Sequence, residues 1–117
     1  MANSISWVEI GGKNPSELKE FYEKVFGWKM QAAPGMDYHM SGQGDMDHAG
    51  LGIGPESPMG PYVTFYIGVD DPQAYLDKAV AAGAHVVAPV TVVPDMVTFA
   101  LFADPEGHVI GITKNSM

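Results

Sequence analysis

The chain has 117 residues, 46% of them apolar and 17% charged, which is typical of one globular domain and not of a disordered segment. It contains no cysteine, so disulfides, thiolate metal ligands and cysteine nucleophiles are excluded. Fourteen acidic residues face six basic ones, all lysine, and the net charge of −8 argues against a nucleic-acid partner.

We also expect no membrane partner, because no apolar run approaches the ~20 residues of a membrane span. The first residues lack the basic and apolar regions of a signal peptide. These two features together favour a soluble cytoplasmic protein.

The first predicted helix lies between Asn14 and Gly27. Asn14 suits the N-cap, Pro15 suits the first turn, and Gly27 can adopt the left-handed conformation that ends a helix. Apolar residues recur at the spacing of one helical stripe, namely Leu18, Phe21, Tyr22, Val25 and Phe26. Alternation and turn residues predict the strands around this helix, near 5–10, 28–32, 36–41 and 47–53.

A second helix is predicted from Asp71 to Gly83, with Pro72 in its first turn. The segment Asp104-Pro-Glu-Gly107 has the composition of a type I turn, which joins the last two strands as a hairpin. Strands are predicted in this half near 63–69, 84–90, 96–103 and 108–113.

The two halves repeat one another when the sequence is shifted by 57 residues. Ile10 then aligns with Ile67, Gly11 with Gly68 and Pro15 with Pro72, and both halves have the order strand, helix, three strands. The repeat predicts an α+β fold of two tandem βαβββ modules within a single domain, 1–117. Its expected parts are module one at about 4–54, a proline-rich linker at 55–61 and module two at about 62–114.

The sequence resembles the vicinal oxygen chelate superfamily, which includes glyoxalase I, extradiol dioxygenases and bleomycin resistance proteins. The resemblance covers about residues 5–113, and the opening Trp7-Val-Glu-Ile together with Phe-Gly-Trp is similar to a glyoxalase-like subgroup of mostly unassigned function. It implies a curled mixed-sheet cup and a homodimer. The motifs that carry it are Phe21-Tyr22…Phe26-Gly27-Trp28, Val69-Asp70-Asp71, Gly83-Ala84 and Asp104-Pro105-Glu106-Gly107.

Enzymes of this family hold a divalent metal with histidine and glutamate side chains from the cup. The resemblance places those ligand positions at Trp7, Thr64, Gly111 and the glycine-rich segment 50–54. An indole, a lone hydroxyl and glycines do not bind Zn²⁺, Ni²⁺ or Fe²⁺ through side chains. We therefore expect no metal and no cofactor. A relocated metal site stays open, with candidates Glu9, His39, His48, His85 and His108.

The same substitutions favour a binding pocket without a metal. Trp7 and Glu9 share one face of a strand, Tyr66 shares a face with Thr64, and the glycines are expected to leave room. The predicted ligand-binding residues are Trp7, Glu9, Thr64, Tyr66 and Gly111. Aromatic rings beside one carboxylate favour a planar or cationic organic molecule. Family members that sequester bleomycin-type antibiotics do so in a cavity at a dimer interface, and the resemblance implies the same arrangement here.

Two other functions stay open at this point. One is an enzyme, either a metal-dependent lyase or dioxygenase with an atypical metal site or a cofactor-free isomerase that uses Glu9 as general base. The other is a structural or regulatory dimer in which Trp7 and Tyr66 fill the cup as core residues. The sequence identifies neither the ligand nor the dimer geometry.

Overall fold

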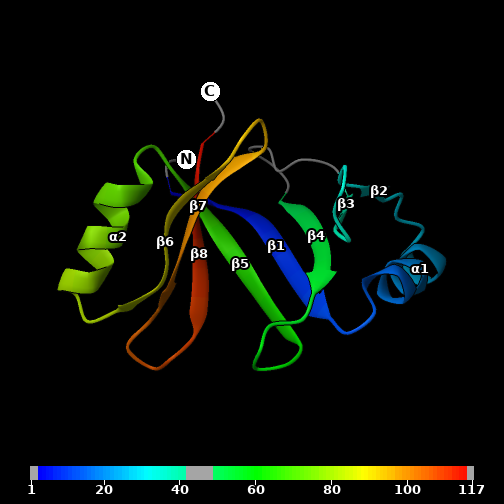
Figure 1. The fold of residues 1–117 in the computed structure, drawn as a ribbon, viewed down its shortest axis with the longest axis horizontal. Coiled ribbons are helices and arrows are strands. Elements are labelled where there is room, and N and C mark those ends of the chain that lie inside the picture. The colour runs from blue at the N-terminus through cyan, green and yellow to red at the C-terminus, as the bar shows by residue number, and fades with distance from the viewer. Residues whose placement is uncertain (1–2, 42–48, 116–117) are drawn as a thin grey trace. The chain divides into compact units, whose positions relative to one another are not determined.

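A computed structural model describes residues 3–41 and 49–115. Its elements run strand, helix and three strands, twice over, which confirms the predicted α+β fold of tandem βαβββ modules (Figure 1). The first module contains β1 (Ile5–Gly12), α1 (Pro15–Phe26), β2 (Gln31–Ala32), β3 (His39–Ser41) and β4 (Gly50–Pro55). The second contains β5 (Tyr62–Val69), α2 (Pro72–Ala81), β6 (His85–Val93), β7 (Val97–Ala103) and β8 (Val109–Lys114).

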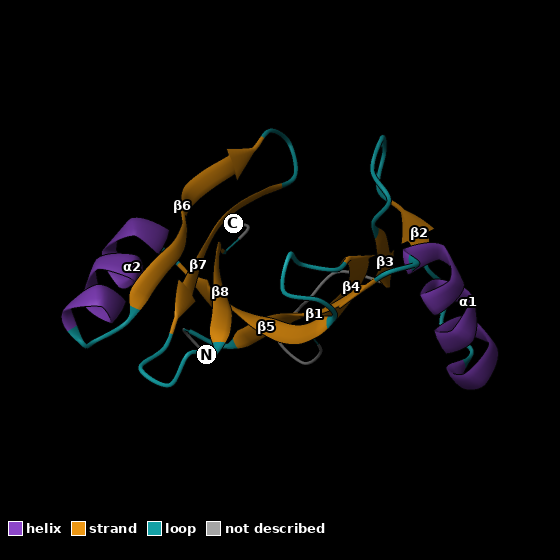
Figure 2. Cartoon of the chain, turned by 60° about the horizontal axis from the view of Figure 1, so that its bottom comes forward, coloured by secondary structure: helices purple, strands orange, loops and turns teal. Residues whose placement is uncertain are grey.

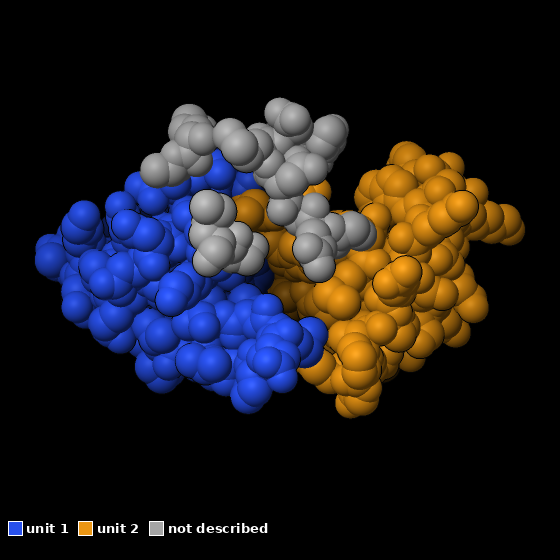
Figure 3. Space-filling view, turned by 90° about the horizontal axis from the view of Figure 1, so that it is seen from above, with its two compact units in different colours: residues 1–5, 65–117 blue, residues 6–64 orange. Residues whose placement is uncertain are grey.

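The chain divides into two compact units, coloured separately in Figure 3. Unit 1 comprises residues 1–5 and 65–117, and unit 2 comprises residues 6–64. The division falls inside β5, a few residues after the proline-rich stretch 55–61. Neither described helix is long and apolar enough to cross a membrane.

In unit 2 the described strands lie in the order β2, β3, β4, β1. β1 is parallel to β4, and the register places Trp7 opposite Gly50 and Glu9 opposite Gly52. α1 contacts β3 and β4 (Figure 2). Ile53 of β4 is fully buried, and Met30 and Ala33 are the other buried hydrophobic residues described in this unit.

In unit 1 the order is β5, β8, β7, β6, with β5 parallel to β8 and the other neighbours antiparallel. α2 lies beside β6 and contacts β6, β7 and β8 (Figure 2). An apolar core includes Leu76 of this helix. The buried members of that core are Val69, Leu76, Ala100 and Ile112. Ile67, Tyr75, Val90 and Phe102 pack around them.

The helix ends follow the sequence signals in part. Gly27 has the left-handed φ of 72° predicted for the end of α1. The Asp71 side chain accepts a hydrogen bond from the Ala74 N–H, as expected of an N-cap. Asn14 stands at the N-cap of α1, but its side chain makes no capping hydrogen bond within the described residues. α2 ends at Ala81, two residues before the positive-φ Gly83.

The strand predicted near 28–32 is wrong over most of its length. β2 has only two residues, because Trp28 stacks on the rings of Tyr22 and Phe26 instead of entering the sheet. β6 extends to Val93, beyond the predicted 84–90, and its register with β7 shifts around Ala88. β2 and β6 are the outermost described strands of their respective units.

Candidate functional site

Glu9 of β1 is the centre of a hydrogen-bonded group of side chains in unit 2. Tyr38 Oη donates to Glu9 Oε2 at 2.7 Å, and Tyr62 Oη donates to Glu9 Oε1 at 2.8 Å. Trp7 Nε1 donates in turn to Tyr38 Oη at 2.9 Å. All four side chains are half-buried. We call Trp7, Glu9, Tyr38 and Tyr62 the tyrosine–glutamate cluster.

Period-two alternation along β1 places this cluster on one face of the strand. Trp7, Glu9 and Gly11 share that face, and the ring of Tyr62 lies directly over Gly11, where any added Cβ would overlap it. A Cβ on Gly12 would instead lie 3.0 Å from Cδ2 of Leu18 in α1. α1 therefore lies on the opposite face of β1 from the cluster.

The glycines of β4 accommodate the ring of Tyr38. A Cβ on Gly52 would overlap the Tyr38 hydroxyl and approach Trp7 Nε1 to 2.9 Å, and one on Gly54 would lie 2.7 Å from Tyr38 Cδ2. The expectation that these glycines leave open space is wrong, since the ring of Tyr38 takes up the volume that they free. Glycine at alternate positions of β4 thus leaves the space in which the Tyr38 ring lies when its hydroxyl bonds to the Glu9 carboxylate.

Burial is the main reason why the pKa of Tyr62 is raised well above its ordinary value, and the hydrogen bond and charge of Glu9 raise it further. The phenol therefore keeps its proton near neutral pH and continues to donate to Glu9. Each carboxylate oxygen accepts a short bond from a different ring. Such an arrangement presents negative charge between aromatic surfaces in a fixed geometry.

The five predicted ligand-binding residues fall into two groups. Trp7, Glu9 and Thr64 lie in unit 2, where Thr64 is buried in β5. Tyr66 and Gly111 lie in unit 1, opposite each other in the register of β5 and β8, and the Tyr66 ring covers Gly111 so closely that a Cβ would overlap it. A single pocket built from both groups stays a prediction.

Tyr38 and Tyr62 are absent from the predicted site. Tyr62 could have been added from alternation along β5, because it shares a strand face with Thr64. Tyr38 lies just before β3, 29 residues from Glu9, and no local spacing links the two. The one signal for Tyr38 is the alternation Gly50-Leu-Gly-Ile-Gly54, which needs a large neighbouring side chain to fill the space.

The residues at the family's metal-ligand positions do not fit a metal ion. Trp7 donates its only polar hydrogen to Tyr38, and the rings of Tyr38 and Tyr66 cover Gly52, Gly54 and Gly111. These positions offer no carboxylate or imidazole to a metal, and the space above the glycines is taken. We derive no chemical step through a metal at this place.

Of the other candidate ligands that the structure describes, His39 lies in unit 2, and His85 and His108 lie in unit 1. His39 is buried in β3 with Nε2 3.1 Å from Asp37 Oδ1, and His85 is exposed at the start of β6. His48 lies outside the described residues. Within residues 3–41 and 49–115, no three acidic or histidine side chains come together as a metal site.

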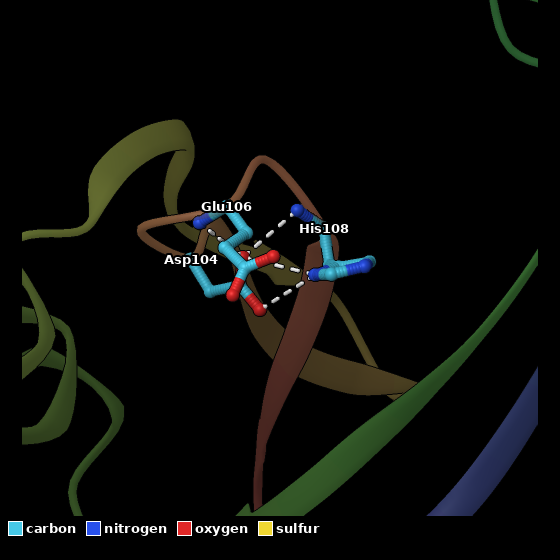
Figure 4. Close-up of polar contacts among 3 residues, drawn as sticks. All are labelled: Asp104, Glu106 and His108. Carbon is cyan, nitrogen blue, oxygen red and sulfur yellow. Dashed lines mark hydrogen bonds and ion pairs between the residues drawn. The ribbon is translucent and has the colours of Figure 1, made fainter.

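His108 belongs to the turn before β8, which Figure 4 shows in detail. Asp104 Oδ1 accepts from the backbone N–H of Glu106 at 3.0 Å and of His108 at 2.9 Å, and the ring Nδ1 of His108 lies 3.0 Å from Asp104 Oδ2. The backbone N–H of His108 holds the pKa of Asp104 below its usual range, with smaller contributions from Glu106 and the His108 ring. The group fixes the predicted turn, which Gly107 N closes onto Asp104 O.

The sequence profile of the Glyoxalase/Bleomycin resistance protein/Dioxygenase superfamily matches residues 4–112. The chain belongs to this superfamily. A curated relative named Putative glyoxylase CFP32, found in Mycobacterium bovis and Mycobacterium tuberculosis, is 31% identical over 114 residues. That match covers 95% of this chain but only 44% of the relative, so the chain spans less than half the length of the curated proteins it matches.

Solved structures of low sequence identity share the fold of this superfamily member. A methylmalonyl-CoA epimerase from Streptomyces coelicolor has a TM-score of 0.73 at 14% identity, over 99% of this chain and 96% of the epimerase. The Mn(II)-bound glyoxalase from Novosphingobium aromaticivorans has a TM-score of 0.68 at 19% identity, over 97% of this chain and 39% of the glyoxalase.

Proposed function

We propose that this chain binds a small organic molecule carrying an aromatic or cationic group, without a metal, at the tyrosine–glutamate cluster. The observation that carries the proposal is the Glu9 carboxylate, which accepts hydrogen bonds from Tyr38 and Tyr62 beside the indole of Trp7. A negative charge close to aromatic rings is complementary to an organic cation.

Three further features support this choice. All four side chains of the cluster are half-buried, so each presents part of its surface to a ligand while the rest is packed. The hydrogen bonds fix three rings and a carboxylate before any ligand arrives, which lowers the entropy lost on binding. The net charge of −8 also raises the local concentration of cations over anions.

Thermal unfolding with benzyltrimethylammonium and a set of larger planar aromatic cations tests the proposal, with benzyl alcohol as the neutral comparison. A binding cation is expected to stabilise the protein by about 2.7 kcal/mol at a hundredfold excess over its Kd. Glu9→Gln should abolish the preference for the cation over the neutral compound. The matched control is Glu56→Gln, which changes an exposed acid of the same unit.

Two results would contradict the proposal. One is an unchanged melting temperature with every cation in the set. The other is cation binding that Glu9→Gln and Trp7→Phe both leave intact, because that would place the binding site elsewhere.

A second candidate is a cofactor-free isomerase with Glu9 as the general base. The half-buried carboxylate among rings favours it, as such a group can abstract a proton from a bound substrate. Each carboxylate oxygen has more than one acceptor position, so one phenol hydrogen bond to each oxygen is compatible with proton transfer from a substrate to Glu9. Loss of turnover in Glu9→Gln, with substrate binding retained, would support this function over simple binding.

A metal-dependent lyase or dioxygenase with an atypical site is the remaining enzymatic alternative. It requires a ligand set other than the family positions, which the rings of Tyr38 and Tyr66 cover. Metal analysis after dialysis against Zn²⁺, Ni²⁺, Mn²⁺ and Fe²⁺ tests it. One tightly held ion per chain would support it and would count against the metal-free proposal. We further propose that the chain forms a homodimer and has no nucleic-acid or membrane partner.

A further inference from the structure

A stacked group of aromatic rings lies on the apolar stripe of α1 and on the residues just after it. Tyr22 lies 5.4 Å from Trp28 and 6.1 Å from Phe26 between ring centroids, and Phe21 meets Tyr22 edge-on at 5.1 Å. Val25 lies one helical turn from Phe21 and next to Phe26 in the chain. We call Phe21, Tyr22, Val25, Phe26 and Trp28 the aromatic face.

Much of this apolar surface is in contact with solvent. Phe21 and Val25 are each 54% exposed, Phe26 is 60% exposed and Trp28 is 37% exposed. Single exposed apolar residues are common, but a contiguous aromatic patch usually marks an interaction surface.

The corresponding helix of the second module is packed differently. In α2, every residue of which is described, Val80 is the one exposed large apolar side chain. α2 packs mainly on β6, β7 and β8, whereas the main described strand contacts of α1 are with β3 and β4. β2 and β3 contain two and three residues, so the sheet beneath α1 is too small to cover the whole apolar stripe.

The charge around the aromatic face differs from that of the remaining chain. Residues 13–29 contain four of the six lysines and three glutamates, a net charge of +1. The rest of the chain contains two lysines and eleven acids, a net charge of −9. Two copies that meet through residues 13–29 therefore avoid bringing their acidic parts together.

We propose that the aromatic face docks a second copy of this chain, face to face about a two-fold axis. Identical faces meet across such an axis, so stacked rings would pack against stacked rings, and glutamates would lie close to lysines of the other copy. The inference goes with the proposed homodimer but is separate from ligand binding, because α1 and the tyrosine–glutamate cluster lie on opposite faces of β1.

Sedimentation equilibrium of wild type and three single variants tests this surface. Phe26→Glu and Val25→Glu place a charge in the aromatic face, and Val80→Glu is the matched control on α2, where the exposed fraction is similar at 46%. We expect each α1 variant to weaken the dimer at least tenfold, as removal of a central interface residue does, and Val80→Glu to leave it unchanged. Circular dichroism verifies that each variant is folded.

A chain without cysteine allows a second, independent measurement. Val25→Cys introduces a single thiol beside the proposed two-fold axis, and a short bismaleimide should join two copies in high yield. Val80→Cys should give little cross-linked dimer under the same conditions. The cross-linking yield does not depend on how Val25→Glu or Phe26→Glu folds.

Three outcomes would overturn the inference: a monomeric wild type at high concentration, a dimer that both α1 charges leave intact, or a dimer that Val80→Glu alone dissociates. Association with vesicles by a chain that remains monomeric in solution would identify a different partner and would also overturn it. Cation binding measured on Phe26→Glu keeps the two proposals apart. Phe26→Glu should lose the dimer but still bind the cation, whereas Glu9→Gln should lose cation binding. The two losses therefore report on different surfaces.

Discussion

The two units have the same order of elements but different interiors. Unit 1 is built around Val69, Leu76, Ala100 and Ile112, a compact apolar cluster beneath α2. Unit 2 has the fully buried Ile53 and, on the other face of β4, glycines covered by the ring of Tyr38, which bonds to Glu9. The repeated topology therefore does not imply repeated chemistry, because the apolar cluster lies in unit 1 and the Glu9 carboxylate held by two phenols lies in unit 2.

The helices extend this comparison to the surface. α2 has a capping Asp71 and a largely covered apolar side, whereas α1 has an N-cap side chain without a capping bond in the described structure and an exposed aromatic face. Unit 1 thus has a buried apolar core beneath its helix, while the two surfaces that we propose for binding both lie in unit 2. Four sets of substitutions, taken from the largest expected effect to the smallest, test how far this contrast holds.

Truncation of the two apolar centres should produce the largest losses. Leu76→Ala in unit 1 and Ile53→Ala in unit 2 each remove a buried aliphatic side chain and leave a cavity. We expect each to lower the free energy of unfolding by about 2–5 kcal/mol in urea titrations. A cost below about 1 kcal/mol for Ile53→Ala would mean that the polar cluster, and not apolar packing, stabilises unit 2.

Gly52→Ala should come next, because its methyl group occupies the place of the Tyr38 hydroxyl. Displacing the ring and breaking its bond to Glu9 should cost about 1–3 kcal/mol. Gly52→Ala combined with Tyr38→Ala is the decisive comparison in urea unfolding. The double variant should cost less than the two single costs added together, and strict additivity would show that the contact is unimportant.

Tyr62→Phe should cost about 1 kcal/mol at neutral pH through the lost hydrogen bond to Glu9. Because the folded pKa of Tyr62 is raised above the ordinary value of 10.0, its contribution is fully present below pH 10 and decreases as the pH rises further. The free energy of unfolding, measured from pH 8 to 11, should therefore fall less steeply in Tyr62→Phe than in wild type. Equal slopes would contradict the assignment.

The N-caps should give the smallest contrast. Asp71→Ala removes the bond to Ala74 N and should cost about 1 kcal/mol. Asn14→Ala removes no capping bond of the described structure and should change stability by less than about 0.5 kcal/mol. Thermal unfolding of both variants under one condition measures the difference, and similar costs would show that Asn14 caps α1 in solution.

Most of the helices and strands could be predicted, because the residues that indicate each element lie close together in the sequence. The helices are indicated by prolines in their first turns, by the apolar stripe along α1 and by Gly27 at its end. Alternation of apolar and polar residues indicates most of the strands. The exception is the segment at Trp28, where stacking on Tyr22 and Phe26 outweighs strand propensity. That competition depends on three rings meeting in space, and propensity along the chain does not contain it.

The candidate site was predictable only in part. Alternation correctly puts Trp7 and Glu9 in one cluster, since both lie on β1. The partners of Glu9 lie 29 and 53 residues away, and their arrival depends on strand pairing and on the space above Gly11 and Gly52. Glycine was interpreted as empty volume, whereas a folded interior fills such volume with the nearest large side chain.

The irregular outer strand of unit 1 has a consequence for the behaviour of the protein at high concentration. β6 exposes Val86, Val87 and Val92, a composition that favours growth of sheets between molecules. Pro89 supplies no N–H for such growth, and the shifted register around Ala88 prevents a long flat edge. In unit 2 the outermost described strand, β2, has two residues and offers little template. Irregular or short outer strands thus limit fibril formation, and electrostatic repulsion between the negatively charged chains limits it further.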